Sequence, residues 1–220
     1  MDAAEGYGQM SALPGLETAI QDRYAGLSTS CCSLSCGSAL ELAQPRVGEV
    51  VVDLGCGRGR DVIRAAGMVG SSGRAIGVDF TEAMLATARK SVPPQLDNVA
   101  FVRCDLSALD LSDASVDVVV SNCTINHAPD KAAVYRELHR VLKPGGRFVV
   151  SDVIADQELP ESVRNDPAAW AACYGGAIPE AEYRSAIEAA GFADIEVLDL
   201  SAPYEKGGVM VRSITVQSHR

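Results

Sequence analysis

The chain has little basic charge, few histidines and no long apolar run, and each shortage excludes a class of function. Its 220 residues include 29 acidic, 19 basic and 3 histidine side chains, for a net charge of −10. A nucleic-acid-binding protein usually presents a basic face, so RNA and DNA are disfavoured as substrates. No stretch of about 18 apolar residues is present, so we expect no membrane-spanning helix. The segment Met1–Glu5 lacks the basic start of a signal peptide, which favours a cytoplasmic protein.

Cysteine, in contrast, is plentiful. Hydrophobic residues make up 47% of the chain, which fits one domain with a sizeable core that folds without disulfide bonds. The chain has seven cysteines, an odd number. This favours reduced thiols that are reactive or bind soft elements over a disulfide framework.

Apolar runs and helical patterns alternate along the chain, which is typical of βαβ units around a parallel sheet. Val50–Leu54 predicts a buried strand, and Asp61–Val69 predicts the helix that follows it. Further strands are expected at 75–78, 99–102, 116–120 and 148–150, further helices at 82–92, 130–142 and 179–190, and a final antiparallel pair at 195–200 and 209–216. We therefore predict an α/β fold with a doubly wound, mostly parallel seven-stranded sheet and a final antiparallel strand.

Two regions are expected. Residues 1–45 are predicted to form an N-terminal cysteine-bearing segment with one helix, at about Leu16–Ala25, and residues 46–220 to form the α/β domain. Two local features sharpen the helix ends. Thr81 is a candidate N-cap, and Lys143–Gly146 ends a helix because proline cannot continue it.

A glycine-rich turn, Asp53–Gly59, follows the first strand and opens the next helix. Glycines let a backbone turn sharply and approach a ligand closely, although a plain tight turn is the alternative. The spacing G-x-G-x-G differs from the G-x-G-x-x-G of dinucleotide binders. Asp79 ends the second strand, where a carboxylate can accept hydrogen bonds from both hydroxyls of a ribose. No lysine follows the glycines as in a phosphate-binding loop, so we predict a nucleoside ligand without phosphates.

This layout, over about Val47–Val150 and the tail, resembles the class I S-adenosylmethionine-dependent methyltransferases. The resemblance implies S-adenosylmethionine as cofactor and a methyltransferase domain over residues 46–220. It places Asp53 near the methionine amino group and Asn122 beside the sulfonium. The other cofactor-binding residues that it implies are Gly55 and Gly57, Asp79 with Phe80 near the ribose, and Asp105 and Leu106 beside the adenine.

Two cysteines occupy positions that suit a site. Cys123 follows the fourth strand, and ligands of open α/β sheets bind at strand carboxyl ends. Cys173 lies beside Gly175–Gly176, in the segment after the fifth strand that commonly covers such a site. Packing is the alternative for both, because cysteine is among the most buried residue types. Cys56 and Cys104 are expected to be packing residues.

A narrower resemblance, to the arsenite methyltransferases, extends over nearly the whole chain. The matching segments, in order, are Tyr7–Gln9, Ser35–Gly37, Gly59–Asp61, Ser121–Asn126, Pro129–Lys131 and Trp170–Ala177. One departure is His127-Ala128, where a more apolar pair is expected. We interpret His127 as a structural residue.

The resemblance implies that Cys36, Cys123 and Cys173 are the catalytic thiolates that bind As(III), and that Tyr7 contacts the cofactor. Cys31 or Cys32 would help deliver the arsenic or form a redox disulfide. Trivalent arsenic is soft and prefers thiolate ligands. Its lone pair would be the nucleophile, so no general base is needed.

The expected partners are arsenite as a small substrate and a thiol reductant, glutathione or a thioredoxin system, without nucleic acid or membrane. Two alternatives stay open. The chain is a methyltransferase of a small organic acceptor with buried cysteines, or a thiol-based metalloid-binding protein without turnover.

Overall fold

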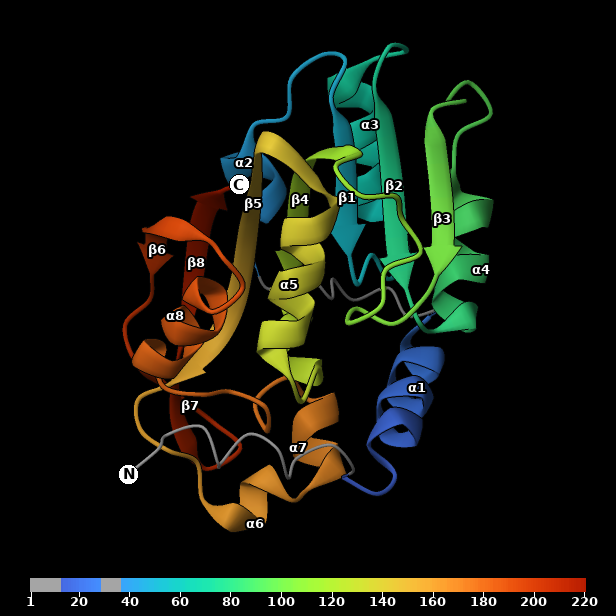
Figure 1. Ribbon diagram of the computed structural model, residues 1–220. Helices are drawn as coiled ribbons and strands as arrows, with labels where there is room; N and C mark the ends of the chain where they lie inside the picture. The colour runs from blue at the N-terminus through green and yellow to red at the C-terminus, as the bar shows by residue number, and fades with distance from the viewer. Residues whose placement is uncertain (1–12, 29–36) are drawn as a thin grey trace.

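The computed structural model describes residues 13–28 and 37–220. Within these residues one eight-stranded sheet runs in the order β3-β2-β1-β4-β5-β8-β6, and β7 pairs with β8 (Figure 1). The strands are β1 Val50–Leu54, β2 Arg74–Asp79, β3 Val99–Arg103, β4 Val116–Asn122, β5 Leu142–Ala155, β6 Ala193–Leu200, β7 Tyr204–Lys206 and β8 Val209–His219.

The sheet confirms the predicted fold class. Strands β1 to β5 are mutually parallel, and β8 runs antiparallel to both β5 and β6. The short strand β7 makes eight strands instead of the seven predicted. Its three residues lie just before the turn at Gly207 and are too few to show an alternating pattern in the sequence.

Strand β5 continues well beyond the predicted 148–150, up to Ala155. Two polar residues, Ser151 and Asp152, follow the predicted end at Val150. Both are buried with partners. Ser151 Oγ lies 2.8 Å from the hydroxyl of Thr215, and the Asp152 carboxylate accepts a hydrogen bond from the Asn126 amide at 3.1 Å. These contacts allow a polar pair inside the sheet.

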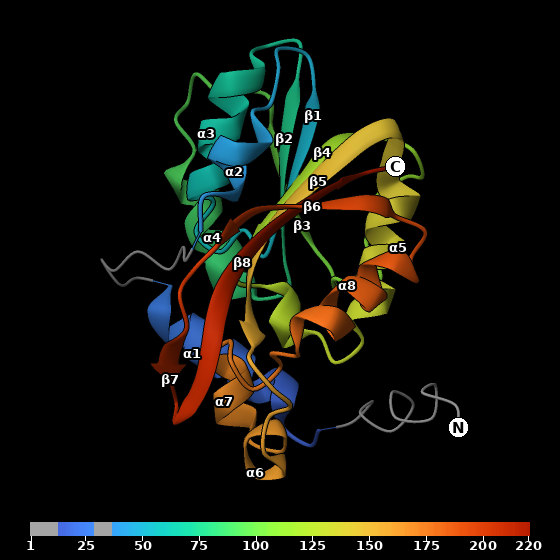
Figure 2. The same cartoon turned by 90° about the vertical axis from the view of Figure 1, so that its left-hand side faces the viewer.

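Helices cover both faces of the sheet (Figures 1 and 2). Along β4, Val118 and Val120 belong to the core on the side of α2, α3 and α4, whereas Val119 belongs to the core under α5 and α8. The helices are α1 Leu16–Leu27, α2 Ala39–Ala43, α3 Arg60–Val69, α4 Glu82–Ser91, α5 Lys131–Val141, α6 Glu161–Arg164, α7 Pro167–Ala171 and α8 Glu180–Glu188, with a 3-10 turn η1 at Ile125–His127.

Helix α1 confirms the helix predicted in the N-terminal segment, and α2 is a second short helix there that the sequence did not indicate. Helices α1, α6 and α7 lie beyond the carboxyl ends of the parallel strands (Figure 1). Leu16 and Ile20 of α1 pack against Trp170 and Ala171 of α7. Burial of such a side chain contributes about 1.5–3 kcal/mol, so α1 is held over this edge by its apolar face.

The first residues of α5 and α4 differ in how they are capped. Asp130 caps α5, because its Oδ1 accepts a hydrogen bond from the Ala133 amide at 2.8 Å. Thr81 occupies the N-cap position of α4, yet its side chain makes no capping hydrogen bond. Its amide instead donates to Asp79 Oδ1 at 2.8 Å, which ties the start of α4 to the end of β2.

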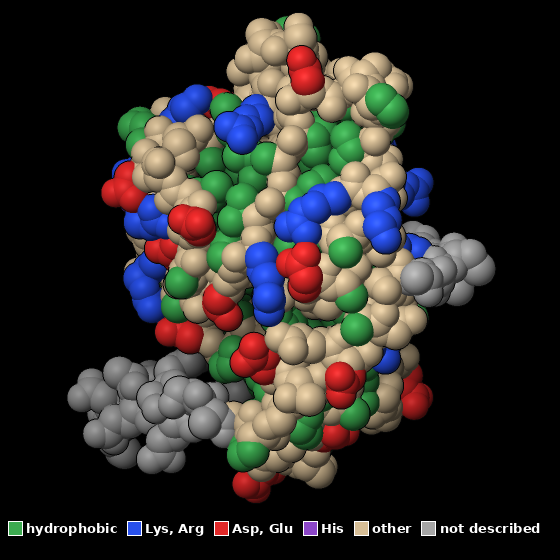
Figure 3. Space-filling model, turned by 90° about the vertical axis from the view of Figure 1, so that its right-hand side faces the viewer, with side chains coloured by type: hydrophobic (Ala, Val, Ile, Leu, Met, Phe, Trp, Pro, Cys, Tyr) green, Lys and Arg blue, Asp and Glu red, His purple; other side chains and the backbone are tan. Residues whose placement is uncertain are grey.

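Two surface features bear on partners. Within the described residues, no helix is both long and apolar enough to cross a bilayer. On the β3 side of the molecule, lysine and arginine side chains are interspersed with aspartate and glutamate (Figure 3). This mixed surface differs from the basic face that is usual in nucleic-acid-binding proteins.

Candidate active site

A cavity of about 890 Å³ lies between α1 and the carboxyl ends of β1, β2 and β4. Its lining includes all the sequence-predicted cofactor residues within the described ranges, namely Asp53, Gly55, Gly57, Asp79, Phe80, Asp105, Leu106 and Asn122. Cys123 also lines it. The crevice at strand carboxyl ends is where open α/β sheets bind ligands.

Two glycines of the turn after β1 differ in the space that surrounds the position of an added Cβ. Gly55 has φ of 68°, and a Cβ there would lie 2.2 Å from the Thr124 hydroxyl, so the position admits only glycine. Gly57 has φ of 51° and open space where its Cβ would be. The first glycine therefore allows close packing of the protein, and the second leaves room for a ligand against the backbone.

Three carboxylates surround this turn. Burial raises the pKa of Asp53 well above its usual range, and the charges of Asp61 and Asp79 raise it further. Burial also raises the pKa of Asp79, although hydrogen bonds from the amides of Thr81 and Gly57, at 2.8 and 2.9 Å, oppose the shift. The negative charges that raise the pKa of Asp53 in this way favour a cationic ligand.

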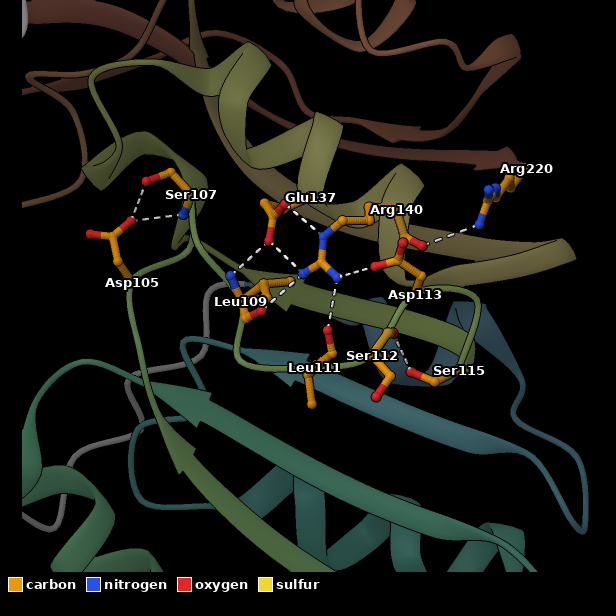
Figure 4. Close-up of polar contacts among 10 residues, drawn as sticks. All are labelled: Asp105, Ser107, Leu109, Leu111, Ser112, Asp113, Ser115, Glu137, Arg140 and Arg220. Atoms are coloured by element: carbon orange, nitrogen blue, oxygen red, sulfur yellow. Dashed lines mark hydrogen bonds and ion pairs between the residues drawn. The ribbon is translucent and has the colours of Figure 1, made fainter.

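The loop between β3 and β4 carries Asp105 and Leu106. Asp105 Oδ1 accepts hydrogen bonds from the amide and hydroxyl of Ser107 at 2.7 and 2.5 Å. Arg140 of α5 reaches across the same loop (Figure 4). Its guanidinium donates at 2.6–2.9 Å to the carbonyl oxygens of Leu109 and Leu111 and to the carboxylates of Asp113 and Glu137. Arg140 thus fixes the loop that positions Asp105.

Asn122 ends β4 and connects three segments. Its Nδ2 donates to Asp61 Oδ2 at 3.3 Å, and its Oδ1 accepts from the Ala39 amide at 3.3 Å. The side chain is therefore held between the first turn of α3 and the start of α2. From there it borders the cavity directly before Cys123 in the chain.

Cys123 and Cys173 come together although 50 residues separate them. The Cys173 sulfur lies 3.4 Å from the Cys123 carbonyl oxygen, and each residue is 7% exposed. Both have left-handed backbones, with φ of 54° and 68°. For a residue with a side chain this conformation costs of the order of 1–3 kcal/mol, and such strain is concentrated at functional sites.

The sulfur of Cys173 has two further neighbours, Tyr24 of α1 and His127 of η1. Tyr24 Oη and His127 Nε2 each lie 3.3 Å from it, and they lie 3.4 Å from each other. Burial lowers the pKa of His127 to about 4, so the imidazole is neutral at pH 7. Burial, and next the thiol of Cys173, raise the pKa of Tyr24. Two neutral groups that can each donate a hydrogen bond therefore face this sulfur.

Sequence reasoning missed Tyr24 and treated His127 as structural. Tyr24 belongs to a helix that lies 149 residues from Cys173, and no spacing pattern links them. The one available signal was the departure at His127, a polar residue where an apolar one is expected.

Asn126, in the middle of η1, connects this cluster to the sheet. Its Nδ2 donates to the Val153 carbonyl at 2.6 Å and to the Cys173 carbonyl at 3.4 Å. Gly176 packs so closely that a Cβ there would lie 2.0 Å from the Asn126 carbonyl oxygen. The turn that bears Cys173 is therefore fixed to the end of β5.

The remaining cysteines lie elsewhere or outside the described residues. Cys56 is buried in the core beneath α3, and burial raises its pKa well above its usual range. Cys104 packs partly buried against the core on the opposite face. The predicted site residues Tyr7, Cys31, Cys32 and Cys36 lie outside the described residues. Gly37, the next residue after Cys36, is described. A Cβ at Gly37 would lie 2.6 Å from the Asn122 side chain.

Comparison with known proteins adds to this geometry. Residues 45–191 match the model of a methyltransferase domain. The arsenite methyltransferase of Halobacterium salinarum is 39% identical over 165 residues, which are 74% of this chain and 42% of that protein. That of Aquipseudomonas alcaligenes is 40% identical over 157 residues, 68% of this chain and 45% of that protein. The chain therefore spans less than half the length of these curated relatives.

A solved structure is also similar over most of the chain. It is the arsenic(III) S-adenosylmethionine methyltransferase from Chlamydomonas reinhardtii, with a TM-score of 0.72 and 32% identity. The match covers 94% of this chain and 74% of that one. The likeness thus extends through the segments that carry both the glycine turn and the cysteine pair.

Proposed function

Because the chain belongs to the family of arsenic(III) S-adenosylmethionine methyltransferases, we propose that it transfers a methyl group from S-adenosylmethionine to trivalent arsenic bound by cysteine thiolates. The observation that carries this proposal is the position of Cys123. It lines the same cavity as the predicted cofactor-binding residues, and its carbonyl oxygen contacts the sulfur of Cys173. Acceptor-binding thiols would thus lie beside the methyl donor.

The charge around the glycine turn supports S-adenosylmethionine as the cofactor. Its sulfonium and ammonium outweigh its single carboxylate, so the molecule is a cation. Asp53, whose pKa is raised by burial and by its acidic neighbours, would hold the ammonium group. Asp79 at the end of β2 would receive the ribose hydroxyls, and Asp105 and Leu106 would flank the adenine. The cofactor supplies an electrophilic methyl group.

The thiols would bind arsenous acid by exchange. One cysteine thiol reacts with one As–OH group, which forms one As–S bond and releases one water molecule. Cys36, Cys123 and Cys173 would together leave the arsenic lone pair as the nucleophile. Holding two reactants in line can lower a barrier by about 7–11 kcal/mol, which makes orientation the main task of the protein.

Tyr24 and His127 would act on Cys173 in that task. With Nε2 and Oη both 3.3 Å from its sulfur, they would direct the sulfur lone pairs toward the arsenic. In this scheme both groups act through the Cys173 sulfur, so both are positioning residues. The strained backbone of Cys173 and the hydrogen bond to its carbonyl from Asn126 would limit its movement further.

Methyl transfer breaks the S–CH3 bond, and the electron pair stays on the cofactor sulfur. The new As–C bond uses the arsenic lone pair, so arsenic is formally oxidised from the trivalent to the pentavalent state. Two thiols of a reductant, such as glutathione or a thioredoxin, would return it to the trivalent state and form a disulfide. We accordingly propose a reducing, cytoplasmic setting, in which the thiols of Cys56, Cys104, Cys123 and Cys173 stay reduced.

A single-turnover reaction with the whole chain, S-adenosylmethionine, arsenite and excess thiol tests the function, with arsenic species separated by chromatography. We expect methylated arsenic and an equal amount of S-adenosylhomocysteine. Arsenite that binds but is not methylated would identify a metalloid-binding protein instead. A chain that binds S-adenosylmethionine but no arsenite would be a methyltransferase of an organic acceptor.

A further inference from the structure

A second cavity, of about 350 Å³, lies on the α2 side of the sheet where β5, β8 and β6 run side by side. Its floor is formed by Ser151 and Thr215, both buried, whose hydroxyl oxygens lie 2.8 Å apart. Ser213 is partly exposed, and Asp199 lies exposed at the edge. No catalytic or cofactor role has been given to any of these four residues.

Cys123 connects this cavity to the active site. Among the described residues it is the one residue that lines both the second cavity and the cofactor cavity. Gly37 and Ser38, which directly follow Cys36 in the sequence, also line the second cavity. Of the three proposed arsenic ligands, Cys123 therefore lines this cavity, and Cys36 directly precedes two lining residues in the chain.

The chemistry of the lining favours a small neutral hydroxyl compound. Hydroxyl groups of serine and threonine can each donate and accept, and a carboxylate accepts from O–H groups. Within the described residues the lining contains no lysine, arginine or histidine, and it includes Asp199, so an anion meets no compensating charge there. A water molecule takes about 30 Å³ of liquid volume, so the space is large enough for a trihydroxide with its hydration.

We infer that this second cavity is the access route by which arsenous acid, a neutral trihydroxide at physiological pH, reaches Cys123 from the side opposite the methyl donor. This inference rests on the proposed function and specifies how the acceptor arrives. Arsenous acid enters past Asp199 and Ser213, exchanges hydrogen bonds with Ser151 and Thr215, and meets the thiolates. Anionic arsenate is disfavoured, because it meets no compensating charge there.

Two separate routes have a kinetic consequence. If both reactants used the first cavity, bound cofactor would block the arsenic, and the order of binding would be forced. With a second opening, arsenous acid binds at the same rate whether or not the cofactor cavity is filled. This difference can be measured without any methyl transfer.

The chain contains one tryptophan, Trp170, and its carbonyl oxygen accepts a hydrogen bond from the Cys173 amide at 2.8 Å. We therefore expect its fluorescence to change when arsenic binds at Cys173. We would mix the reduced, whole chain with excess arsenite in a stopped-flow instrument, both free and saturated with S-adenosylhomocysteine. The association rates are expected to agree within about twofold, as two separate openings require.

Leucine substitutions at lining residues then test the route, because the larger side chain narrows the second cavity. Ser213→Leu, at a partly exposed position, is expected to slow arsenite association at least tenfold while the affinity for S-adenosylmethionine stays unchanged. Thr215→Leu should do the same from the floor. Thr215→Ser is the matched control, because it keeps the hydroxyl and adds no volume. Arsenic bound beforehand should be methylated at the wild-type rate in all three variants.

The opposite pattern overturns the inference. S-adenosylhomocysteine would then slow arsenite association tenfold or more, and Ser213→Leu would leave it unchanged. In that case arsenic still binds and is methylated, so the proposed function stands while the second route fails. A wild-type chain that gives no arsenite signal and no methylated arsenic would overturn both.

Discussion

The candidate active site has two halves, the cofactor half around the glycine turn and the thiol half around Cys123 and Cys173. Both contain left-handed backbone, but different residue types adopt it. In the cofactor half, Gly55 and Gly57 have positive φ, and glycine adopts it without steric cost. In the thiol half, Cys123 and Cys173 have positive φ and carry side chains. The comparison shows that backbone strain is accepted at the two positions where a cysteine side chain is present. Under the proposed function, the cofactor half needs backbone next to its ligand, whereas the thiol half needs sulfur.

The largest expected effect comes from removing a sulfur. Cys123→Ser and Cys173→Ser each replace a soft ligand with a hard hydroxyl, so we expect methylation of arsenite to fall at least a hundredfold. Affinity for S-adenosylmethionine should stay within about twofold, because the cofactor half is intact. Single-turnover rates and calorimetric titration measure the two quantities. Cys104→Ser is the control, and full activity in either site variant would contradict the assignment.

Alanine substitutions at Gly55 and Gly57 are expected to have different main effects, the first on the free energy of unfolding and the second on cofactor affinity. Gly55→Ala places a Cβ 2.2 Å from Thr124 at positive φ. The sum of overpacking and backbone strain should lower the free energy of unfolding by roughly 2–5 kcal/mol. Gly57→Ala meets no protein atom within 4 Å, so it should cost only about 1 kcal/mol of stability but weaken cofactor binding tenfold or more. Urea unfolding and calorimetry test both, and equal losses of stability would refute the distinction.

The pH dependence of stability should have opposite signs in the two halves. The pKa of His127 is lowered from 6.5 to about 4 by burial, so the folded state favours the neutral ring. Its stabilising contribution is present above pH 6.5 and is lost as the pH falls toward 4. The pKa of Asp53 is raised from 3.8, so its contribution is present below pH 3.8 and is lost as the pH rises through the raised value.

For His127 this amounts to about 2–3 kcal/mol, allowing for its partial exposure. Comparing the unfolding free energy of wild type and His127→Gln between pH 7 and pH 4 isolates it, since the variant has no imidazole to protonate there. His139→Gln serves as the control, because His139 is more exposed and shows the smaller pKa lowering. An equal pH dependence in wild type and His127→Gln would rule out this account.

The smallest effect compares glycine with alanine at a cysteine position. Cys173→Gly and Cys173→Ala both remove the thiol and should both abolish methylation. Glycine relieves the left-handed strain and alanine keeps it, so Cys173→Gly should be the more stable of the two by about 1 kcal/mol. Thermal unfolding monitored by circular dichroism resolves this difference. A more stable alanine variant would show that the φ of 68° stores no strain.

The two halves also differ in how far the sequence predicts them. Asp53, Asp79 and Asn122 lie at the carboxyl ends of three adjacent strands of one sheet, so local patterns place them at a common edge. The neighbours of Cys173 come from α1 and η1, and their approach depends on how α1 packs against α7. Packing of separate elements leaves no periodic signal in a chain. The extension of β5 was missed for a related reason, because the partner of Ser151 is Thr215, 64 residues away.

The left-handed backbone at Cys123 and Cys173 also bears on how such a protein drifts by mutation. Cysteine codons become glycine codons through one base change, and glycine is the residue that this backbone accommodates best. Relief of strain offsets part of the lost side-chain packing, so the fold and the cofactor cavity survive the change. Under the proposed function, loss of arsenic methylation is therefore one mutation away, and we expect the resulting protein to remain a folded scaffold that can acquire a different acceptor.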